Sequence, residues 1–246
     1  MITISPGHWT VGTGASDLID EVTEARKVAK EVTKILRASG IVTNYIEDNT
    51  SKTKAQNLTY LVTQHNKTSR KLDVSIHFNS SSGRQSKGIG TEVLYYDEKG
   101  LAAKVSKAIA NASGLIDRGA KQRKELAILA STNKPAILIE VCFVNSAVDV
   151  AVYRRAFNKI CSAIADELAK HVGKSLKGSE EELVFSSPTL REVVEKLMKD
   201  KKAQKEFIQK GIAAKAFNKS WLEKFNKGEL EEHDIIGLHV IYAQAK

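Results

Sequence analysis

The strongest constraint on this chain is a set of three short apolar segments, each presenting one metal-binding or acid–base side chain. The first ends at His8, the second reaches His77 and the third carries Glu140; they span residues 2–8, 71–79 and 136–141. Segments with helical spacing of apolar residues separate them, so the pattern predicts an α/β fold with a mixed, largely parallel sheet flanked by helices. Ligands of such sheets bind at the carboxyl ends of the strands, and we therefore expect the three side chains to meet at one edge.

The composition changes after Gly173. Residues 173–187 are rich in Gly, Ser, Lys and then Glu, and their last two residues, Ser-Ser, precede Pro188, which is typical of a linker. We predict an α/β domain over residues 1–174, a linker over 175–187 and a small all-α domain over 188–246. About sixty residues supply only a thin apolar core, so the last domain is expected to dock on the first or to self-associate.

The chain of 246 residues has a formal net charge of +9. A basic surface favours polyanions, and the charge leaves nucleic acid, anionic lipid and the anionic polymers of a bacterial wall open. No apolar run is long enough to span a bilayer, and the first residues lack the basic and apolar stretches of a signal peptide. We therefore expect the chain to be made in the cytoplasm, with no membrane segment.

Several segments carry weaker local predictions. The two cysteines, Cys142 and Cys161, lie in apolar contexts and are expected to be buried hydrophobes rather than disulfide partners. His65 lies on the polar face of a helix predicted over residues 54–69, and we expect it to be solvated. Further strands are predicted over residues 41–46, 88–96 and 126–129, and a loop over 114–125.

The histidines suggest a zinc site. A catalytic zinc typically takes three protein ligands from His and Glu and keeps a fourth position for water. His8 and His77 are two candidates, since each follows a short strand. The third should be a carboxylate, and Glu21 and Glu24 both lie near the start of the first helix, so spacing leaves both open.

Glu140 is the most informative single residue. A glutamate within an apolar strand is costly to bury unless it is paired or functional. Its neighbours Ile139 and Val141 offer no partner. Two interpretations follow: a structural ion pair with an arginine such as Arg118, or a general base and acid next to a zinc site.

Five stretches follow one another in an informative order. They are Ser5-Pro6-Gly7-His8, a glutamate that opens a helix, Ser75-Ile76-His77-Phe78-Asn79, Arg118-Gly119-Ala120-Lys121 and Leu138-Ile139-Glu140-Val141-Cys142-Phe143-Val144-Asn145. This order resembles that of zinc-dependent N-acetylmuramoyl-L-alanine amidases, the cell-wall amidases of bacterial autolysins and phage endolysins. The resemblance covers residues 1–172, and the stretches around His77 and Glu140 are its most specific parts.

The resemblance implies that His8, Glu21 and His77 bind Zn²⁺ and that Glu140 is the catalytic acid and base. Glu21, rather than Glu24, has the family's interval to the glycine that closes its helix. Residues 1–174 are then a zinc amidase catalytic domain.

Three further residues are predicted to contact substrate. Asn79 lies two residues beyond His77 and points to the same side of an extended strand. Trp9 stands where the family commonly has glycine, and it would either stack on a sugar or peptide face or simply pack. Arg118 belongs to the fourth matching stretch. The chain also has Ser5 where the family often has Asp, and it lacks an arginine found after the second strand, but no ligand position is lost.

The implied function is peptidoglycan hydrolysis. A zinc-activated water would cleave the amide bond between N-acetylmuramic acid and L-alanine, in a phage endolysin made in the host cytoplasm that acts on the wall after release. Residues 188–246 would bind the cell wall, including its anionic polymers, or form a homodimer; no nucleic-acid or membrane partner is expected. Two alternatives stay open: a zinc peptidase acting on the stem peptide, and a non-enzymatic basic protein that binds wall or nucleic acid and leaves Glu140 unexplained.

Overall fold

The computed structural model describes residues 1–177, 200–230, 234–235 and 237–238. The chain divides into two compact units, residues 1–181 and 182–246, which are described separately. Most of the predicted linker, the predicted helix that starts at Pro188 and most of the last predicted helix lie outside the described residues. The domain limits of 1–174, 175–187 and 188–246 therefore stay predictions.

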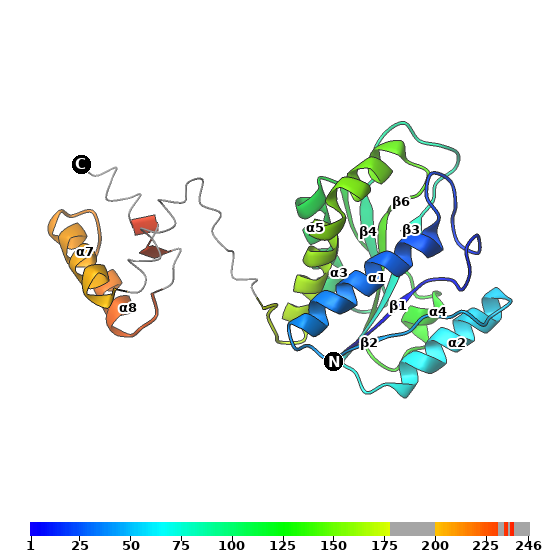
Figure 1. The fold of residues 1–246 in the computed structure, drawn as a ribbon, viewed down its shortest axis with the longest axis horizontal. Helices are drawn as coiled ribbons and strands as arrows, with labels where there is room; N and C mark the ends of the chain where they lie inside the picture. The colour runs from blue at the N-terminus through cyan, green and yellow to red at the C-terminus, as the bar shows by residue number, and fades with distance from the viewer. Residues whose placement is uncertain (178–199, 231–233, 236, 239–246) are drawn as a thin grey trace. The chain divides into compact units, whose positions relative to one another are not determined.

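The first unit is built on a mixed six-stranded sheet (Figure 1). Its strands, in the spatial order β2-β1-β3-β6-β4-β5, are β2 (Thr43–Tyr45), β1 (Ile2–Pro6), β3 (Leu72–Asn79), β6 (Ala136–Phe143), β4 (Thr91–Tyr95) and β5 (Asp117–Gln122). The first four run parallel, and β4 pairs antiparallel with β6 and parallel with β5. This confirms the predicted fold class and brings the carboxyl ends of β1, β3 and β6 to one edge.

Helices cover both faces of the sheet (Figure 1). On one face, α1 (Glu21–Ala38), α3 (Lys99–Ser113) and α5 (Ala147–His171) enclose the larger apolar core, in which residues such as Ile4, Val74 and Ile139 have no exposed surface. On the other face, α2 (Lys54–Lys67) and α4 (Ala127–Ala130) cover a smaller cluster around Leu61 and Leu138. The two cysteines are buried and unbonded, as predicted.

Helix α1 begins where the sequence places its start. Asp20 is its N-cap, and the Oδ1 atom accepts the backbone N–H of Thr23 at 2.8 Å. Gly40 follows the helix with φ of 73°, a left-handed conformation that glycine adopts without strain. The cap fixes Glu21 as the first helical residue and directs it toward the ends of β1 and β3.

Three predicted elements are wrong in detail. The loop predicted over residues 114–125 contains strand β5, which its polar sequence concealed because an edge strand has little apolar surface to bury. The strand predicted over 126–129 is the short helix α4. Strand β4 starts later than predicted, because Asp149 accepts the backbone N–H groups of Ile89 and Gly90 at 3.0 and 2.9 Å.

His65 is fully buried, which contradicts the prediction that it is solvated. Its Nδ1 atom lies 2.7 Å from Asp73 Oδ1 and its Nε2 atom lies 3.0 Å from Ser5 Oγ. Arg70 donates to both oxygens of Asp73, each at 2.7 Å. The polar face of α2 at His65 therefore packs against polar side chains of β1 and β3 and is not exposed to solvent.

The second unit contains α7 (Lys201–Ala213) and α8 (Ser220–Asn226), with Ile208, Phe217 and Leu238 buried together. Gly211 admits the ring of Phe217, since a Cβ there would lie 2.0 Å from it. Among the described helices, none combines the length and the apolar character that crossing a membrane requires.

Candidate metal centre

His8 follows β1 in an unusual backbone conformation. Its φ is 63°, in the left-handed region that residues other than glycine rarely adopt. Such conformations cluster at functional sites. The Nε2 atom of His8 lies 3.1 Å from Glu21 Oε2, so this turn of the backbone accompanies a direct contact between two predicted ligands.

Glu21 occupies the centre of the cluster and is almost completely buried. Its Oε2 atom accepts the backbone N–H of Ala15 at 2.7 Å, and its Oε1 atom accepts that of Phe78 at 3.2 Å. Burial alone would raise the pKa of Glu21, but the hydrogen bonds and charges of His77 and His8 outweigh it and hold the pKa well below its usual range. The carboxylate is therefore ionised at neutral pH.

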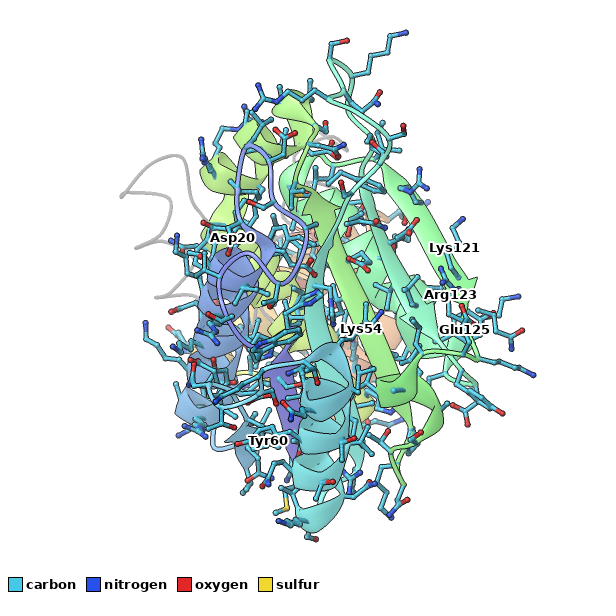
Figure 2. All side chains as sticks on the ribbon, turned by 90° about the vertical axis from the view of Figure 1, so that its right-hand side faces the viewer. Asp20, Lys54, Tyr60, Lys121, Arg123 and Glu125 are labelled. Atoms are coloured by element: carbon cyan, nitrogen blue, oxygen red, sulfur yellow. The ribbon has the colours of Figure 1, made fainter. Side chains whose placement is uncertain are left out.

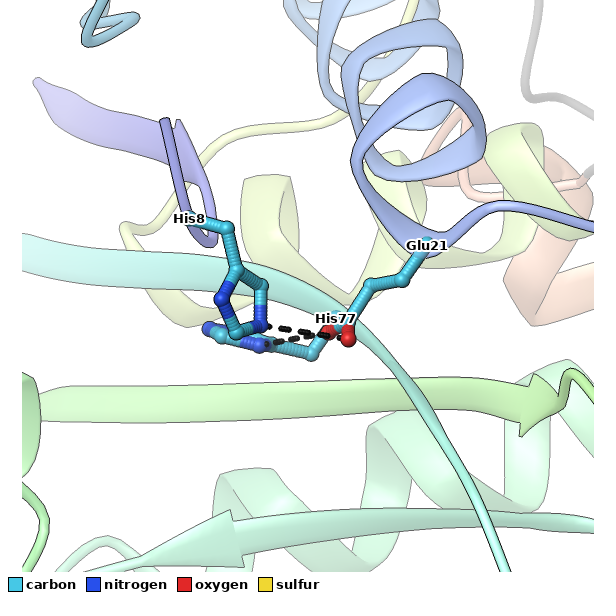
Figure 3. A group of neighbouring side chains, drawn as sticks. All are labelled: His8, Glu21 and His77. Carbon is cyan, nitrogen blue, oxygen red and sulfur yellow. Dashed lines mark hydrogen bonds and ion pairs between the residues drawn. The ribbon is translucent and has the colours of Figure 1, made fainter. Parts of the chain in front are cut away.

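His77, in β3, contributes the third donor. Its Nδ1 atom lies 2.9 Å from Glu21 Oε1, and its Nε2 atom lies 3.0 Å from Ser75 Oγ. Both imidazole rings converge on the one carboxylate (Figure 3). One ligand atom from each of His8, Glu21 and His77 lies within 4.8 Å of the others.

This donor set fits zinc. Two imidazole nitrogens and one carboxylate are a ligand combination of catalytic zinc sites, which keep one position open for water. The carboxylate is already ionised, as a metal ligand must be. Glu24, the other candidate for the carboxylate ligand, instead accepts hydrogen bonds from Tyr153 Oη and Lys27 Nζ, each at 2.8 Å. The structure thus brings together the three residues that the resemblance selected.

Glu140 lies beside this cluster in β6, in register with His77 on β3 and with Glu92 on β4. Its Oε2 atom is buried and has no hydrogen-bond partner among the described residues. Burial raises the pKa of Glu140 to about 8, and the negative charges of Glu21 and Glu92 add to the effect. Arg118, proposed as a structural partner, does not pair with it.

Arg118 pairs instead with Glu92, a site residue that sequence reasoning missed. Its Nε atom donates to Glu92 Oε2 at 2.7 Å, and Asn79 Nδ2 donates to Oε1 at 3.0 Å. The signal that singled out Glu140, a carboxylate within a buried strand, was also present at Glu92. Because β4 runs antiparallel to β6, the start of β4 lies at the same edge as the end of β6.

A pocket of about 400 Å³ opens beside the metal cluster. Most of its polar lining comes from the residues described above, including His8, Glu21, His77, Asn79 and Glu140, whereas an apolar wall comes from α2, α4 and adjoining segments: Leu58, Leu61, Val62, Leu126, Ile128 and Leu138.

Two cations, Lys54 and Arg123, also line this pocket. Figure 2 shows Lys54 over the sheet, and Arg123 near the edge of the sheet beside its ion-pair partner Glu125. Trp9 is half-buried and does not line the pocket; its backbone carbonyl accepts Arg26 at 2.7 Å. Of the three predicted substrate contacts, Asn79 therefore lies in the pocket, and Arg118 reaches it only through Glu92.

Comparisons with known proteins agree with this geometry. A family model described as N-acetylmuramoyl-L-alanine amidase matches residues 2–170. An uncharacterized protein of Clostridium perfringens is 34% identical over 158 residues, which are 62% of this chain and 46% of that protein. The chain spans about half the length of the curated relatives it matches.

Solved structures of cell-wall amidases and of an endolysin are also similar to this chain. The catalytic domain of the CD27L endolysin targeting Clostridia difficile has a TM-score of 0.63 and 26% identity, over 72% of this chain and 98% of that domain. The N-acetylmuramoyl-L-alanine amidase AmiC2 of Nostoc punctiforme has a TM-score of 0.59 and 25% identity, over 70% of this chain and 97% of that one.

Proposed function

The chain belongs to the N-acetylmuramoyl-L-alanine amidase family, and from this we propose that it hydrolyses the amide bond between N-acetylmuramic acid and L-alanine in peptidoglycan. The observation that carries the proposal is the cluster of His8, Glu21 and His77 with Glu140 in register beside it. An amide needs an activated nucleophile and a proton for its leaving amine, and this arrangement supplies groups for both.

Zinc is the cofactor of this family, and His8, Glu21 and His77 would hold it. When bound, zinc acts as a Lewis acid toward a carbonyl oxygen and makes water a stronger nucleophile at neutral pH. Glu21 contributes the negative charge of the site, and the two histidines contribute neutral donors.

Glu140 moves the proton. It accepts a proton from the attacking water while the water oxygen bonds to the amide carbon. It then donates that proton to the nitrogen of L-alanine as the carbon–nitrogen bond breaks, which releases an amine and a lactyl carboxylic acid; the acid then ionises and its proton passes to the amine or to solvent. A raised pKa suits this double role, because a group that titrates near the working pH serves both as base and as acid.

The pocket offers groups for further contacts with the substrate. Its apolar wall on α2 and α4 suits the methyl groups of the lactyl ether and of L-alanine. The Asn79 amide, which donates to Glu92, also lines the pocket and would donate a hydrogen bond to a peptide carbonyl of the substrate.

A role as a phage endolysin, made in the host cytoplasm and acting on the wall after release, is the narrower form of the proposal. The similarity to an endolysin catalytic domain supports it, and the net charge of +9 is compatible with binding to the anionic polymers of a wall. Residues 188–246 would then bind the wall or form a homodimer. A wall pull-down of the full chain and of a chain that ends at residue 177, with light scattering on both, separates these two roles.

Product analysis tests the activity. Purified peptidoglycan digested with the chain should yield new L-alanine amino termini while the glycan strands stay intact. A zinc peptidase would instead expose amino termini within the stem peptide, and a wall-binding protein would expose none. Either of these results would overturn the amidase proposal.

A further inference from the structure

Two register-paired serines on neighbouring strands each contact a histidine ring. Ser5 on β1 is the partner of Ser75 on β3, and both are buried on the same face of the sheet. Ser5 Oγ lies 3.0 Å from Nε2 of His65, and Ser75 Oγ lies 3.0 Å from Nε2 of His77. Only the second pair includes a residue of the metal cluster, so the first provides an internal comparison.

The ring of His77 is held on three sides. Glu21 Oε1 is 2.9 Å from Nδ1 of His77, and Ser75 Oγ lies next to the other ring nitrogen, Nε2. The backbone of Gly7 lies against the ring, since a Cβ on Gly7 would be 2.0 Å from Cε1 and 2.4 Å from Nε2 of His77. Rotating the ring by half a turn would break both hydrogen bonds, so Nδ1 is the atom that points into the cluster.

A metal ligand must offer a lone pair, and a neutral imidazole has one on only one nitrogen. With Nδ1 in the cluster, the proton of His77 has to be on Nε2. Ser75 Oγ is the one acceptor that the described part of the chain places at that nitrogen. The opposite tautomer, with Nδ1–H donating to Glu21 and the serine donating to Nε2, would keep both hydrogen bonds but could not bind metal.

We propose that Ser75 is a positioning residue that accepts the Nε2 proton of His77 and so leaves Nδ1 available to the metal. The proposal goes beyond the amidase function, since it concerns how the site retains its metal whatever bond is cleaved. Partners of this kind fix the tautomer and orientation of a ligand histidine, and losing one typically weakens metal affinity about 10- to 100-fold.

The test measures zinc affinity of the full chain by competition with a chromophoric chelator. Ser75→Ala removes the acceptor and should weaken zinc binding about 10- to 100-fold. Ser5→Ala is the matched control, because it removes a hydroxyl of equal burial from the adjacent register position and also leaves a histidine nitrogen without its partner. Both variants should lose stability, but Ser5→Ala should keep an affinity close to that of the wild type.

Equal zinc affinity in Ser75→Ala and wild type would overturn the proposal, and so would an equal loss in Ser5→Ala. Ser75→Thr retains the hydroxyl and should recover most of the affinity. Nitrogen-15 NMR of the zinc-loaded wild type gives a check that needs no variant: His77 should carry its proton on Nε2, and a proton on Nδ1 would refute the assignment. None of these readouts uses peptidoglycan turnover, so failure of the amidase proposal would be seen separately.

Discussion

Replacing Glu140 by Gln should make the metal-free protein more stable at alkaline pH. The Oε2 atom of Glu140 is buried without a hydrogen-bond partner among the described residues. Burial and the charges of Glu21 and Glu92 raise its pKa from 4.5 to about 8. Glutamine has nearly the shape of the protonated acid but cannot ionise, so the substitution removes the cost of the buried charge and little else.

The sign follows from where the proton is held. Between pH 4.5 and about 8, the folded protein keeps a proton on Glu140 that the unfolded chain has released. The free energy of unfolding therefore falls as the pH rises through this window, and the loss is complete above about pH 8. At about 1.36 kcal/mol per pKa unit, the difference between 4.5 and about 8 sets an upper limit of about 5 kcal/mol.

Guanidinium unfolding of wild type and Glu140→Gln, in chelator, at pH 5, 7 and 9 measures this difference. The free energy of unfolding of the variant should equal that of the wild type at pH 5 and exceed it by a growing amount toward pH 9. Taking this difference cancels the contribution of titrating groups common to both proteins. Glu92→Gln is the control, because it also replaces a carboxylate at the site by an amide. At pH 6 it should destabilise the protein modestly, since it removes the ion-pair partner of the partly exposed Arg118. If the free energies of unfolding of Glu140→Gln and wild type changed with pH in parallel, the assignment of Glu140 as a buried, protonated acid would be refuted.

Three further outcomes follow. Glu140→Gln should retain zinc, measured by metal analysis, but lose about 10²- to 10⁴-fold in turnover of purified peptidoglycan; near-wild-type turnover would remove Glu140 from the chemistry. Gly7→Ala should lower zinc affinity in the chelator competition, because its Cβ would lie 2.0 Å from the ring of His77, and unchanged affinity would mean that the ring moves freely. Asp73→Asn should cost about 3–5 kcal/mol in chemical unfolding because it leaves buried Arg70 without its anionic partner; a change below about 1 kcal/mol would show that the pair is replaceable.

The metal cluster could be predicted because its signals are local. His8 and His77 each follow an apolar run of strand length, and parallel strands bring such ends to one edge. Spacing could not decide whether Glu21 or Glu24 is the third metal ligand, since the two lie three residues apart near the start of one helix. The resemblance to the amidase family selected Glu21. The structure gives the physical reason: the side chain of Glu24 contacts Tyr153 on α5.

The parts that were missed depend on contacts distant in sequence. His65 looked solvated because its own helix face is polar, and nothing local indicates that Ser5 and Asp73 present a polar strip beneath it. The sequence left an ion pair between Arg118 and Glu140 as one of two interpretations of Glu140, whereas Arg118 pairs with Glu92. The antiparallel pairing of β4 with β6 that brings Glu92 next to Glu140 cannot be inferred from the local pattern. Strand β5 was missed since its pairing comes from the backbone, and its side chains are polar.

The most direct test of the account is a zinc titration of the metal-free chain on purified peptidoglycan, with release of L-alanine amino termini as the readout. The account predicts no release without metal, a rise in proportion to added zinc and a plateau at one zinc per chain. His77→Ala, treated in the same way, should neither bind the zinc nor release the termini. Full release by the metal-free wild type, or by His77→Ala, would contradict the claim that His8, Glu21 and His77 form the zinc site of an amidase.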